Sequence, residues 1–423
     1  MKVARISTIT PPAVAGATAT LRRIGANSGV VAIRLLSVAA GLAYVKAYTH
    51  ALSTPEVGLF FYLSTLSYAI NALVFVPVDF YMQARLASLA AVPARAISNL
   101  VLRVLAIGLA VCIAASLPLI QLGKLQWGDL PAMYAVAALL YLCSTLRNLL
   151  NNRGRTVFVS AMLLIESSGR LVAFVALAAL LNASARTLMI SSALGLALEL
   201  ALVLLATRRL ARAAEPKHLD DGRIILRTSA PIAGAAVCNA VQLQGYRVAY
   251  PLAHHSATSG LFGVVSNIGA AAMSAAGSIY SQLQTPRLYA SQGRYVRRFA
   301  LLAGALACVL LIVALLTAHL LVSTLTGPQY LPYAYAVGFG IVIEACNLIV
   351  GGYTIALTIS SRTALLFKLN LLAAAVSAAG CCAALLLRPG EPMLIGASLA
   401  GSQMLMTLAL AALVSLPPVE RNH

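Results

Sequence analysis

Charged side chains inside apolar segments are the residues of this sequence whose types could do chemistry. Four cations fall within predicted helices: Arg34, Lys46, Arg170 and Arg247. Placing a charge at the centre of a bilayer costs about 2.5–3.5 kcal/mol even on insertion scales. Each of these cations therefore needs an ionic partner, an aqueous cavity or a function.

Three of these cations belong to two segments that we expect to face each other. Arg34 and Lys46 share the segment 28–50, with Lys46 about 18 Å further along a helix. Arg247 lies in the segment 229–252, one position from the repeat counterpart of Lys46. A vestibule lined by all three would bind an anionic group such as a phosphate. For Lys46, a side chain that extends to the outer lipid headgroups is an equally good interpretation.

Acidic residues within the segments are candidates for binding a coupling ion: Asp79, Glu166, Glu199 and Glu344. Glu166 stands four residues before Arg170, the spacing of an intrahelical ion pair, which favours a structural role. Glu199 and Glu344 have no neighbour of opposite charge on their own segments, and apolar surroundings favour the neutral form of a carboxyl. Glu344 is the first choice because it is nearest the predicted midplane of its helix.

Other polar residues have two interpretations each. Asp79 is close to a predicted helix end, where Arg34 or Arg85 would pair with it. Asn239 and Gln242 share a helical face in the seventh segment. Amides on a cavity wall would hydrogen-bond sugars, and they would equally serve to join neighbouring helices.

The elements that must position these residues are helices that cross a membrane. Of the 423 residues, 61% are hydrophobic and only 10% are charged, against about 25% charged in soluble domains. The mean hydropathy is +0.89. Because a spanning helix needs about 20 apolar residues, the sequence predicts an all-α membrane protein with about twelve transmembrane helices. No segment is long and polar enough to form a separate soluble domain.

Twelve apolar segments can be placed on the chain. Two tight hairpins, at 53–56 and near Asn182, separate segments that would otherwise merge, and proline and polar residues justify both breaks. The predicted segments are 28–50, 57–80, 97–120, 130–150, 157–181, 186–206, 229–252, 260–284, 299–325, 332–358, 364–387 and 392–414.

The chain contains an internal repeat. A shift of 202 positions places Tyr44–Leu86 on Tyr246–Leu288 without a gap, and it aligns a Gly-Leu-Phe triplet and an Arg-Leu pair in both copies. The repeat predicts two six-helix lobes, 28–206 and 229–414, as membrane transporters are commonly built, with the substrate between the lobes. The alternative is convergence of two helical hairpins on residue types that suit a membrane.

The distribution of cations indicates a membrane topology rather than nucleic-acid binding, despite a net charge of +19. Twenty-three of the thirty Lys and Arg residues, Arg147 among them, fall on one side, and only Lys124, Arg186 and Arg388 on the other. This positive-inside pattern places both termini in the cytoplasm. The remaining stretches are predicted to be cytoplasmic: the basic tail 1–27, the linker 207–228 and the tail 415–423.

No pattern in the sequence indicates a metal, a cofactor or catalytic residues. The seven cysteines lie in apolar segments, without a CxxC motif or histidines at ligand spacing, and are expected to be small core residues. His254 and His255 are adjacent, so their side chains point in different directions and make a poor metal site. We therefore expect no cofactor, no metal and no enzymatic activity.

Two short motifs carry a resemblance to a known family. Residues 52–60 read Leu-Ser-Thr-Pro-Glu-Val-Gly-Leu-Phe, similar to the turn that follows helix one in that family. Residues 146–155 are similar to its basic stretch between helices four and five. On these motifs, and on length, helix count and the repeat, the chain resembles the polysaccharide-type flippases. These are the O-antigen and exopolysaccharide transporters of the multidrug/oligosaccharidyl-lipid/polysaccharide exporter superfamily.

The resemblance implies translocation of an undecaprenyl-diphosphate-linked oligosaccharide across the bacterial inner membrane, by alternating access and with an ion gradient as the driving force. It implies the lipid-linked oligosaccharide, membrane lipid and polysaccharide polymerase or assembly proteins as partners, in lipopolysaccharide or exopolysaccharide biosynthesis. Arg34, Lys46 and Arg247 match the family's cationic cavity by location, not by a fixed motif. The low aromatic content and the long N-terminal tail depart from the family pattern, and twelve helices rather than fourteen disfavour its peptidoglycan-precursor branch.

Three other functions remain open at the level of sequence. A multidrug and toxin extrusion antiporter for organic cations would need acids in its cavity, and Arg34 and Arg247 count against it. A polysaccharide polymerase or ligase would carry a large periplasmic loop, whereas every predicted outer loop is short. A scaffold that transports nothing is the third alternative.

Overall fold

The computed structural model describes residues 17–86, 94–152, 154–207, 234–360 and 362–415. Eleven helices in this part are long and apolar enough to cross a membrane, and no described residue belongs to a strand. The predicted all-α membrane fold with about twelve helices is confirmed. Of the predicted cytoplasmic stretches, residues 1–16, 208–228 and 416–423 lie outside the described residues.

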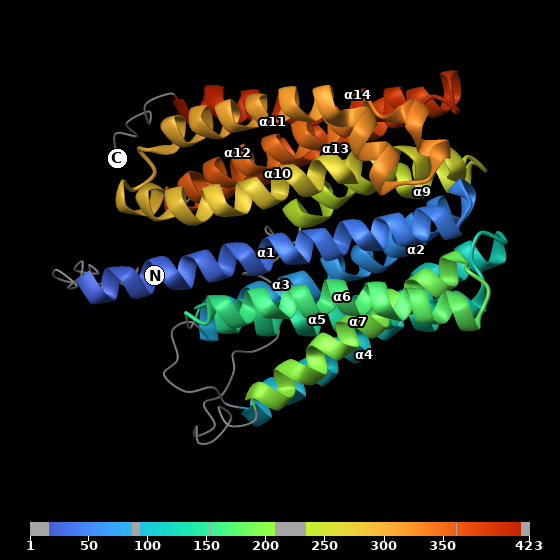
Figure 1. Ribbon diagram of the computed structural model, residues 1–423, viewed down its shortest axis with the longest axis horizontal. Helices are drawn as coiled ribbons and strands as arrows, with labels where there is room; N and C mark the ends of the chain where they lie inside the picture. The colour runs from blue at the N-terminus through green and yellow to red at the C-terminus, as the bar shows by residue number, and fades with distance from the viewer. Residues whose placement is uncertain (1–16, 87–93, 153, 208–233, 361, 416–423) are drawn as a thin grey trace.

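The helices form two groups, which we call the N-lobe and the C-lobe (Figure 1). The N-lobe consists of α1 (Ala17–Ala51), α2 (Thr54–Ile70), the π-helical turn η1 (Asn71–Phe75), α3 (Val76–Leu86), α4 (Ala94–Gln121), η2 (Trp127–Asp129), α5 (Leu130–Asn152), α6 (Thr156–Leu180) and α7 (Ala185–Thr207). The C-lobe consists of a helical segment from 234 to 244, α9 (Tyr246–Leu252), α10 (Ser256–Ala290), α11 (Val296–Leu325), η3 (Pro328–Tyr333), α12 (Ala336–Ile359), α13 (Thr363–Leu387) and α14 (Pro392–Ser415).

The helix boundaries follow the sequence repeat. The starts of α2 and α10, at Thr54 and Ser256, are 202 positions apart. Each of α4 and α11 is followed by a short 3-10 helix. Both predicted tight hairpins are present as helix breaks, one before Thr54 and one between α6 and α7.

The two copies differ at one point. In the N-lobe a π-helical turn interrupts the second spanning helix, whereas α10 is α-helical throughout. Within this turn Phe75 stacks on Tyr141 of α5 at 4.8 Å between ring centroids, and Asn71 Nδ2 donates to the carbonyl of Ala137, 3.3 Å away. Single π turns within α-helices are frequently found at functional sites.

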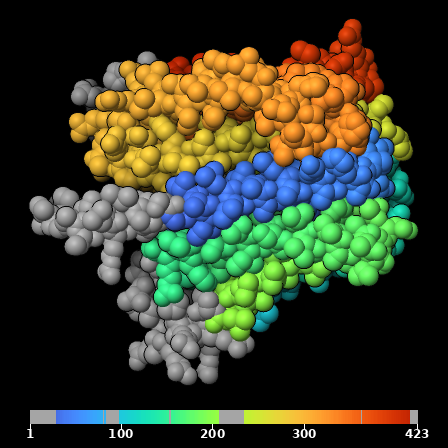
Figure 2. All heavy atoms as spheres, viewed as in Figure 1, coloured from blue at the N-terminus to red at the C-terminus, as the bar shows by residue number. Residues whose placement is uncertain are grey.

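Helix α1 lies at the boundary between the lobes but packs chiefly on α6. Ser37 Oγ donates to the carbonyl of Leu163 on α6, and the Tyr44 hydroxyl contacts Ser191 Oγ on α7 at 3.1 Å. In the space-filling view the surface of α1 runs between the C-lobe and the other helices of the N-lobe (Figure 2). Helix α1 therefore belongs to the N-lobe and presents one face to the C-lobe.

The lobes are joined at the end of the bundle where α2 and α10 begin. Helix α2 packs on α10 there. Lys124 Nζ of the N-lobe donates to the Leu252 carbonyl at 2.9 Å and lies 2.7 Å from His254 Nε2. Gln329 Nε2 of the C-lobe donates to the Thr49 carbonyl at 3.0 Å. These contacts close the space between the lobes at this end.

Candidate functional site

A cavity of about 450 Å³ lies between the two lobes, bounded by α1, α6 and α10. We call it the interlobe cavity. Arg34 and Arg170 both line it, and Asn267 and several serines supply neutral polar groups. None of the described residues that line it is an Asp or a Glu. The interlobe cavity is therefore lined by guanidinium groups and by no described acid, which suits a group with negative charge.

Arg34 carries charge that is not used within the described chain. Its side chain is half-buried, and its Nε is buried without a hydrogen-bond partner among the described residues. A buried polar atom without a partner costs free energy, and in a cavity a ligand can supply that partner. Arg34 is therefore positioned to bind substrate.

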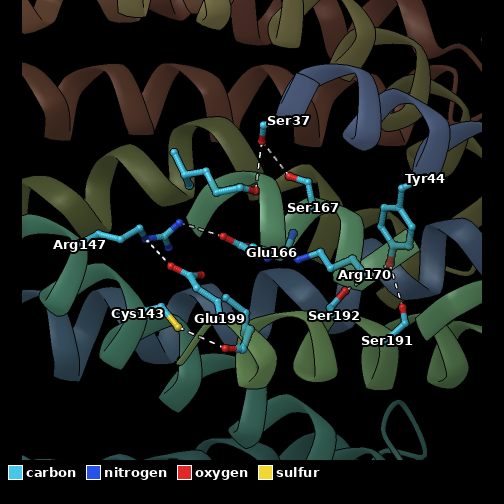
Figure 3. Close-up of polar contacts among 12 residues, drawn as sticks. Ser37, Tyr44, Cys143, Arg147, Glu166, Ser167, Arg170, Ser191, Ser192 and Glu199 are labelled. Carbon is cyan, nitrogen blue, oxygen red and sulfur yellow. Dashed lines mark hydrogen bonds and ion pairs between the residues drawn. The ribbon is translucent and has the colours of Figure 1, made fainter. Parts of the chain in front are cut away.

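Arg170 belongs to a network of four charged residues inside the N-lobe (Figure 3). It pairs with Glu166 one helical turn before it, so the predicted ion pair is present. Glu166 Oε2 also accepts from Arg147 NH1 of α5 at 2.8 Å. Arg147 Nε in turn lies 3.5 Å from Glu199 Oε1 of α7. The network joins α5, α6 and α7, and its two arginines and two glutamates balance in formal charge.

Arg147 is a residue whose place sequence reasoning missed. The sequence places it with the cytoplasmic loop cations, because it stands close to the predicted end of its segment. The structure puts it within α5, its side chain only 14% exposed, against the fully buried Glu199. The sequence signalled only that Glu199, an acid in a spanning segment without an opposite charge on its own helix, needs a partner from another helix, and it did not identify Arg147 as that partner.

Arg247 lies beside the interlobe cavity rather than in its lining. Its NH2 donates to Asn267 Oδ1 at 3.1 Å, and its Nε donates to the Tyr246 hydroxyl at 2.9 Å. The guanidinium also lies 4.5 Å from the ring centroid of Phe61 on α2, a cation–π contact between the lobes. Asn267 lines the cavity, so Arg247 orients a residue of the cavity wall through this hydrogen bond.

The predicted vestibule of three cations is not assembled. Lys46 is exposed and lines none of the described cavities. Twelve residues separate it from Arg34, which at 3.6 residues per turn places the two side chains about 120° apart around α1. Arg34 faces the cavity, so Lys46 faces away from it. This position corresponds to the headgroup interpretation of Lys46.

Glu344 lines a second cavity, of about 460 Å³, enclosed by α10, α11 and α12 within the C-lobe. We call it the acidic cavity. Glu344 Oε2 accepts a hydrogen bond from Asn347 Nδ2 of the same helix at 3.2 Å. No Lys or Arg lines this cavity within the described residues. Glu344 thus faces space that a cation or a proton donor could enter.

The two amides of the seventh segment have different surroundings. Asn239 lines a third cavity, of about 340 Å³, which we call the amide cavity. Gln242 is fully buried, and its side-chain Nε2 donates to Ser402 Oγ of α14 at 3.0 Å. The backbone carbonyl of Gln242 accepts a hydrogen bond from Ser377 Oγ of α13. Gln242 therefore joins helices, and Asn239 faces open space.

Asp79 is buried at the start of α3 and accepts from Asn148 Nδ2 of α5, 3.3 Å away. Of its two predicted partners, Arg34 lines the interlobe cavity, and Arg85 has a side chain outside the described residues. Asp79 lines none of the cavities described above. The preceding residue, Val78, belongs to a hydrophobic cluster that includes residues of α3, α4 and α5.

Comparison with solved structures shows the fold. A multidrug resistance MATE family transporter of the MOP superfamily in its inward-facing conformation matches with a TM-score of 0.55 and 12% identity, over 91% of this chain and 94% of that one. The Vibrio cholerae MATE transporter VcmN matches with a TM-score of 0.51 and 13% identity, over 94% and 98% of the two chains. A MATE protein in complex with MaL6 matches with a TM-score of 0.59 and 10% identity, over 92% and 98%. The chain therefore has the fold of MATE transporters of the MOP superfamily.

No family model matches the sequence. No curated protein matches it either.

Proposed function

We propose that this protein is a membrane transporter that works by alternating access between its two lobes. The support is the fold shared with MATE transporters over nearly the whole length of both chains. The position of the interlobe cavity, which is closed at the end where α2 meets α10, also supports this proposal. With the predicted cytoplasmic termini, this arrangement corresponds to a cavity that opens toward the cytoplasm.

The substrate we propose is an undecaprenyl-diphosphate-linked oligosaccharide, moved from the cytoplasmic to the periplasmic leaflet of a bacterial inner membrane. The observation that carries this proposal is the cationic lining of the interlobe cavity. Arg34 and Arg170 face it, and no described acid does. A diphosphate would satisfy the partnerless Nε of Arg34, and guanidinium groups bind phosphate oxygens in a bidentate manner.

The cycle that follows has the lobes rocking about the contact of α2 with α10. The diphosphate enters between α1 and α10 and binds Arg34, while the prenyl chain remains in the lipid. Separation of the lobes at the Lys124–Leu252 and Gln329–Thr49 contacts then exposes the headgroup on the other side. Glu344 is the residue we propose for ion coupling, because a bound proton or cation shifts the two states only through different affinities for them.

A multidrug and toxin extrusion-type cation antiporter is the second candidate. Structural neighbours described as multidrug resistance MATE transporters favour it, and so does Glu344 in a cavity without a described Lys or Arg. An organic cation would then bind in the acidic cavity of the C-lobe. The two candidates differ in the sign of the charge that the transported molecule carries.

Transport by the purified chain in proteoliposomes separates these functions. Vesicles are offered the undecaprenyl-diphosphate oligosaccharide or a lipophilic cationic dye, with wild type, Arg34→Ala and Lys46→Ala compared. Movement of the glycolipid that falls with Arg34→Ala but not with Lys46→Ala supports the flippase. Dye movement without glycolipid movement, lost in Glu344→Gln, would establish the antiporter instead.

A further inference from the structure

We propose that the C-lobe contains a carbohydrate-binding subsite, formed by the acidic and amide cavities, which holds the first sugars of the transported glycolipid. The inference rests on the proposed function and assigns it a second contact region. Arg34 and the interlobe cavity bind the diphosphate. The subsite binds the neutral polar part of the same molecule.

The three cavities adjoin one another. Ser274 and Ser278 of α10 line both the interlobe cavity and the acidic cavity. Asn347 and Gly351 of α12 line both the acidic cavity and the amide cavity. The shared residues place the three cavities in a row from Arg34 between the lobes, past the hydroxyls of α10, to the amides of α12, and we call this row the tract. A ligand that occupies this tract must be elongated, with its charged end at the interlobe cavity.

The charge of the lining changes along this tract. Two arginines face the interlobe cavity, whereas no Lys or Arg among the described residues lines the other two cavities. The amide cavity has no described acid in its lining either. A phosphate is therefore favoured only at the first position, and a neutral polar group is favoured at the last.

Hydrogen bonds hold the amides of the subsite in a defined orientation. Gln403 Nε2 of α14 donates to Asn347 Oδ1 at 3.1 Å, and Asn347 Nδ2 donates to Glu344 Oε2 at 3.2 Å. Gln403 is only 1% exposed, and its Oε1 is buried without a hydrogen-bond partner among the described residues. This acceptor lies in a residue that lines the amide cavity, so a ligand hydroxyl there would supply the missing donor.

The composition of the lining matches sugar hydroxyls. Asn239 and Asn370 face the same cavity as Gln403, and each amide offers both a donor and an acceptor. A sugar hydroxyl also donates and accepts, so one ring can satisfy several amides at once. The acidic cavity, at about 460 Å³, and the amide cavity, at about 340 Å³, fall within the range of small-molecule sites.

Gly351 provides a steric test of the subsite. It lines both C-lobe cavities, and beyond its own stretch of helix backbone no atom lies within 4 Å of the position that a Cβ would take there. A leucine at this position would extend into the cavities without a clash at its Cβ, and it would favour the helix. Gly304 of α11 has equally open surroundings and lies outside these cavities, so Gly304→Leu is the matched control.

The experiment measures equilibrium binding to the full chain in nanodiscs. The two probes are undecaprenyl diphosphate and the same lipid carrying N-acetylglucosamine as its first sugar. Wild type is expected to bind the sugar-bearing lipid about tenfold more tightly, the scale of one or two net hydrogen bonds. Gly351→Leu and Gln403→Leu should remove that difference and leave the affinity for the bare lipid unchanged. Gly304→Leu should behave as wild type.

The outcomes separate this inference from the proposed function. Equal affinities of wild type for the two lipids, or a sugar preference that survives in both Gly351→Leu and Gln403→Leu, would overturn the subsite while the flippase stands. Binding of neither lipid by wild type would overturn the flippase and the subsite with it. Thermal unfolding of each variant in the nanodisc identifies a loss of fold.

Discussion

Gly58 of α2 and Gly260 of α10 occupy equivalent positions in the two copies of the repeat and meet each other across the lobes. A Cβ on Gly260 would lie 2.9 Å from the Gly58 nitrogen and 2.5 Å from the Thr54 carbonyl oxygen. A Cβ on Gly58 would lie 1.9 Å from the Ser256 carbonyl oxygen. Neither contact leaves room for a side chain. The repeated glycines are thus what allows the two helix backbones to approach and close this end of the bundle.

Gly260→Val is expected to hold the lobes apart at this end, because backbone atoms of α2 cannot yield as a flexible side chain would. The distance between spin labels at Leu122 of the N-lobe and Arg388 of the C-lobe, both exposed, should shift to longer values. Transport should fall at least tenfold, since one of the two states is lost. Gly304→Val, at a position with open surroundings, is the control, and an unchanged label distance in Gly260→Val would refute the role of the glycine contact.

Arg34→Ala is expected to weaken the binding of undecaprenyl diphosphate by at least tenfold, the scale of one charge-assisted hydrogen bond of about 1.5–3 kcal/mol. Arg34→Lys should recover part of the affinity, because the charge returns without the fork of donors. Lys46→Ala is the matched control, since its side chain is exposed on another face of the same helix. An equal loss of binding in Lys46→Ala would show that general cationic charge, and not the interlobe cavity, attracts the lipid.

Arg147→Met is expected to lower the free energy of unfolding in detergent by about 3 kcal/mol or more, because it leaves Glu199 buried without a cation. The double variant Arg147→Met with Glu199→Gln should regain a large part of that loss, since it removes the uncompensated charge. Thermal or denaturant unfolding of the purified variants measures both effects. If the single and double variants were equally unstable, the Arg147–Glu199 pair would not be the source of the stability.

Glu344→Gln is expected to abolish the dependence of transport on the ion gradient while the binding of substrate in the interlobe cavity persists. The amide cannot change its protonation, and it still accepts the hydrogen bond from Asn347. Proteoliposome transport with and without an imposed proton gradient tests this, with Glu166→Gln as a comparison outside the acidic cavity. Transport by Glu344→Gln that still responded to the proton gradient as wild type does would remove Glu344 from the coupling role.

Part of the candidate site could be derived from residue spacing alone. The Glu166–Arg170 pair follows from an interval of four on one helix, and the placement of Lys46 on a different helical face follows from its interval of twelve after Arg34. The Arg147–Glu199 pair could not be derived, because α5 and α7 are brought together only by packing. The same holds for Gln242, whose partner Ser402 is 160 residues away on α14.

The sequence by itself determined that the chain forms apolar helices in two repeated sets, because a bilayer accepts only segments that satisfy their own backbone hydrogen bonds. It also determined which residues carry charge into those helices. The tertiary structure decided which of these charges share a space. Arg34 faces a cavity, Arg247 contacts Asn267 and Phe61, and Arg147 joins two acids, because each outcome depends on how neighbouring helices are rotated and crossed. The hydropathy of a segment does not predict that rotation, because the rotation depends on contacts between residues far apart in the chain.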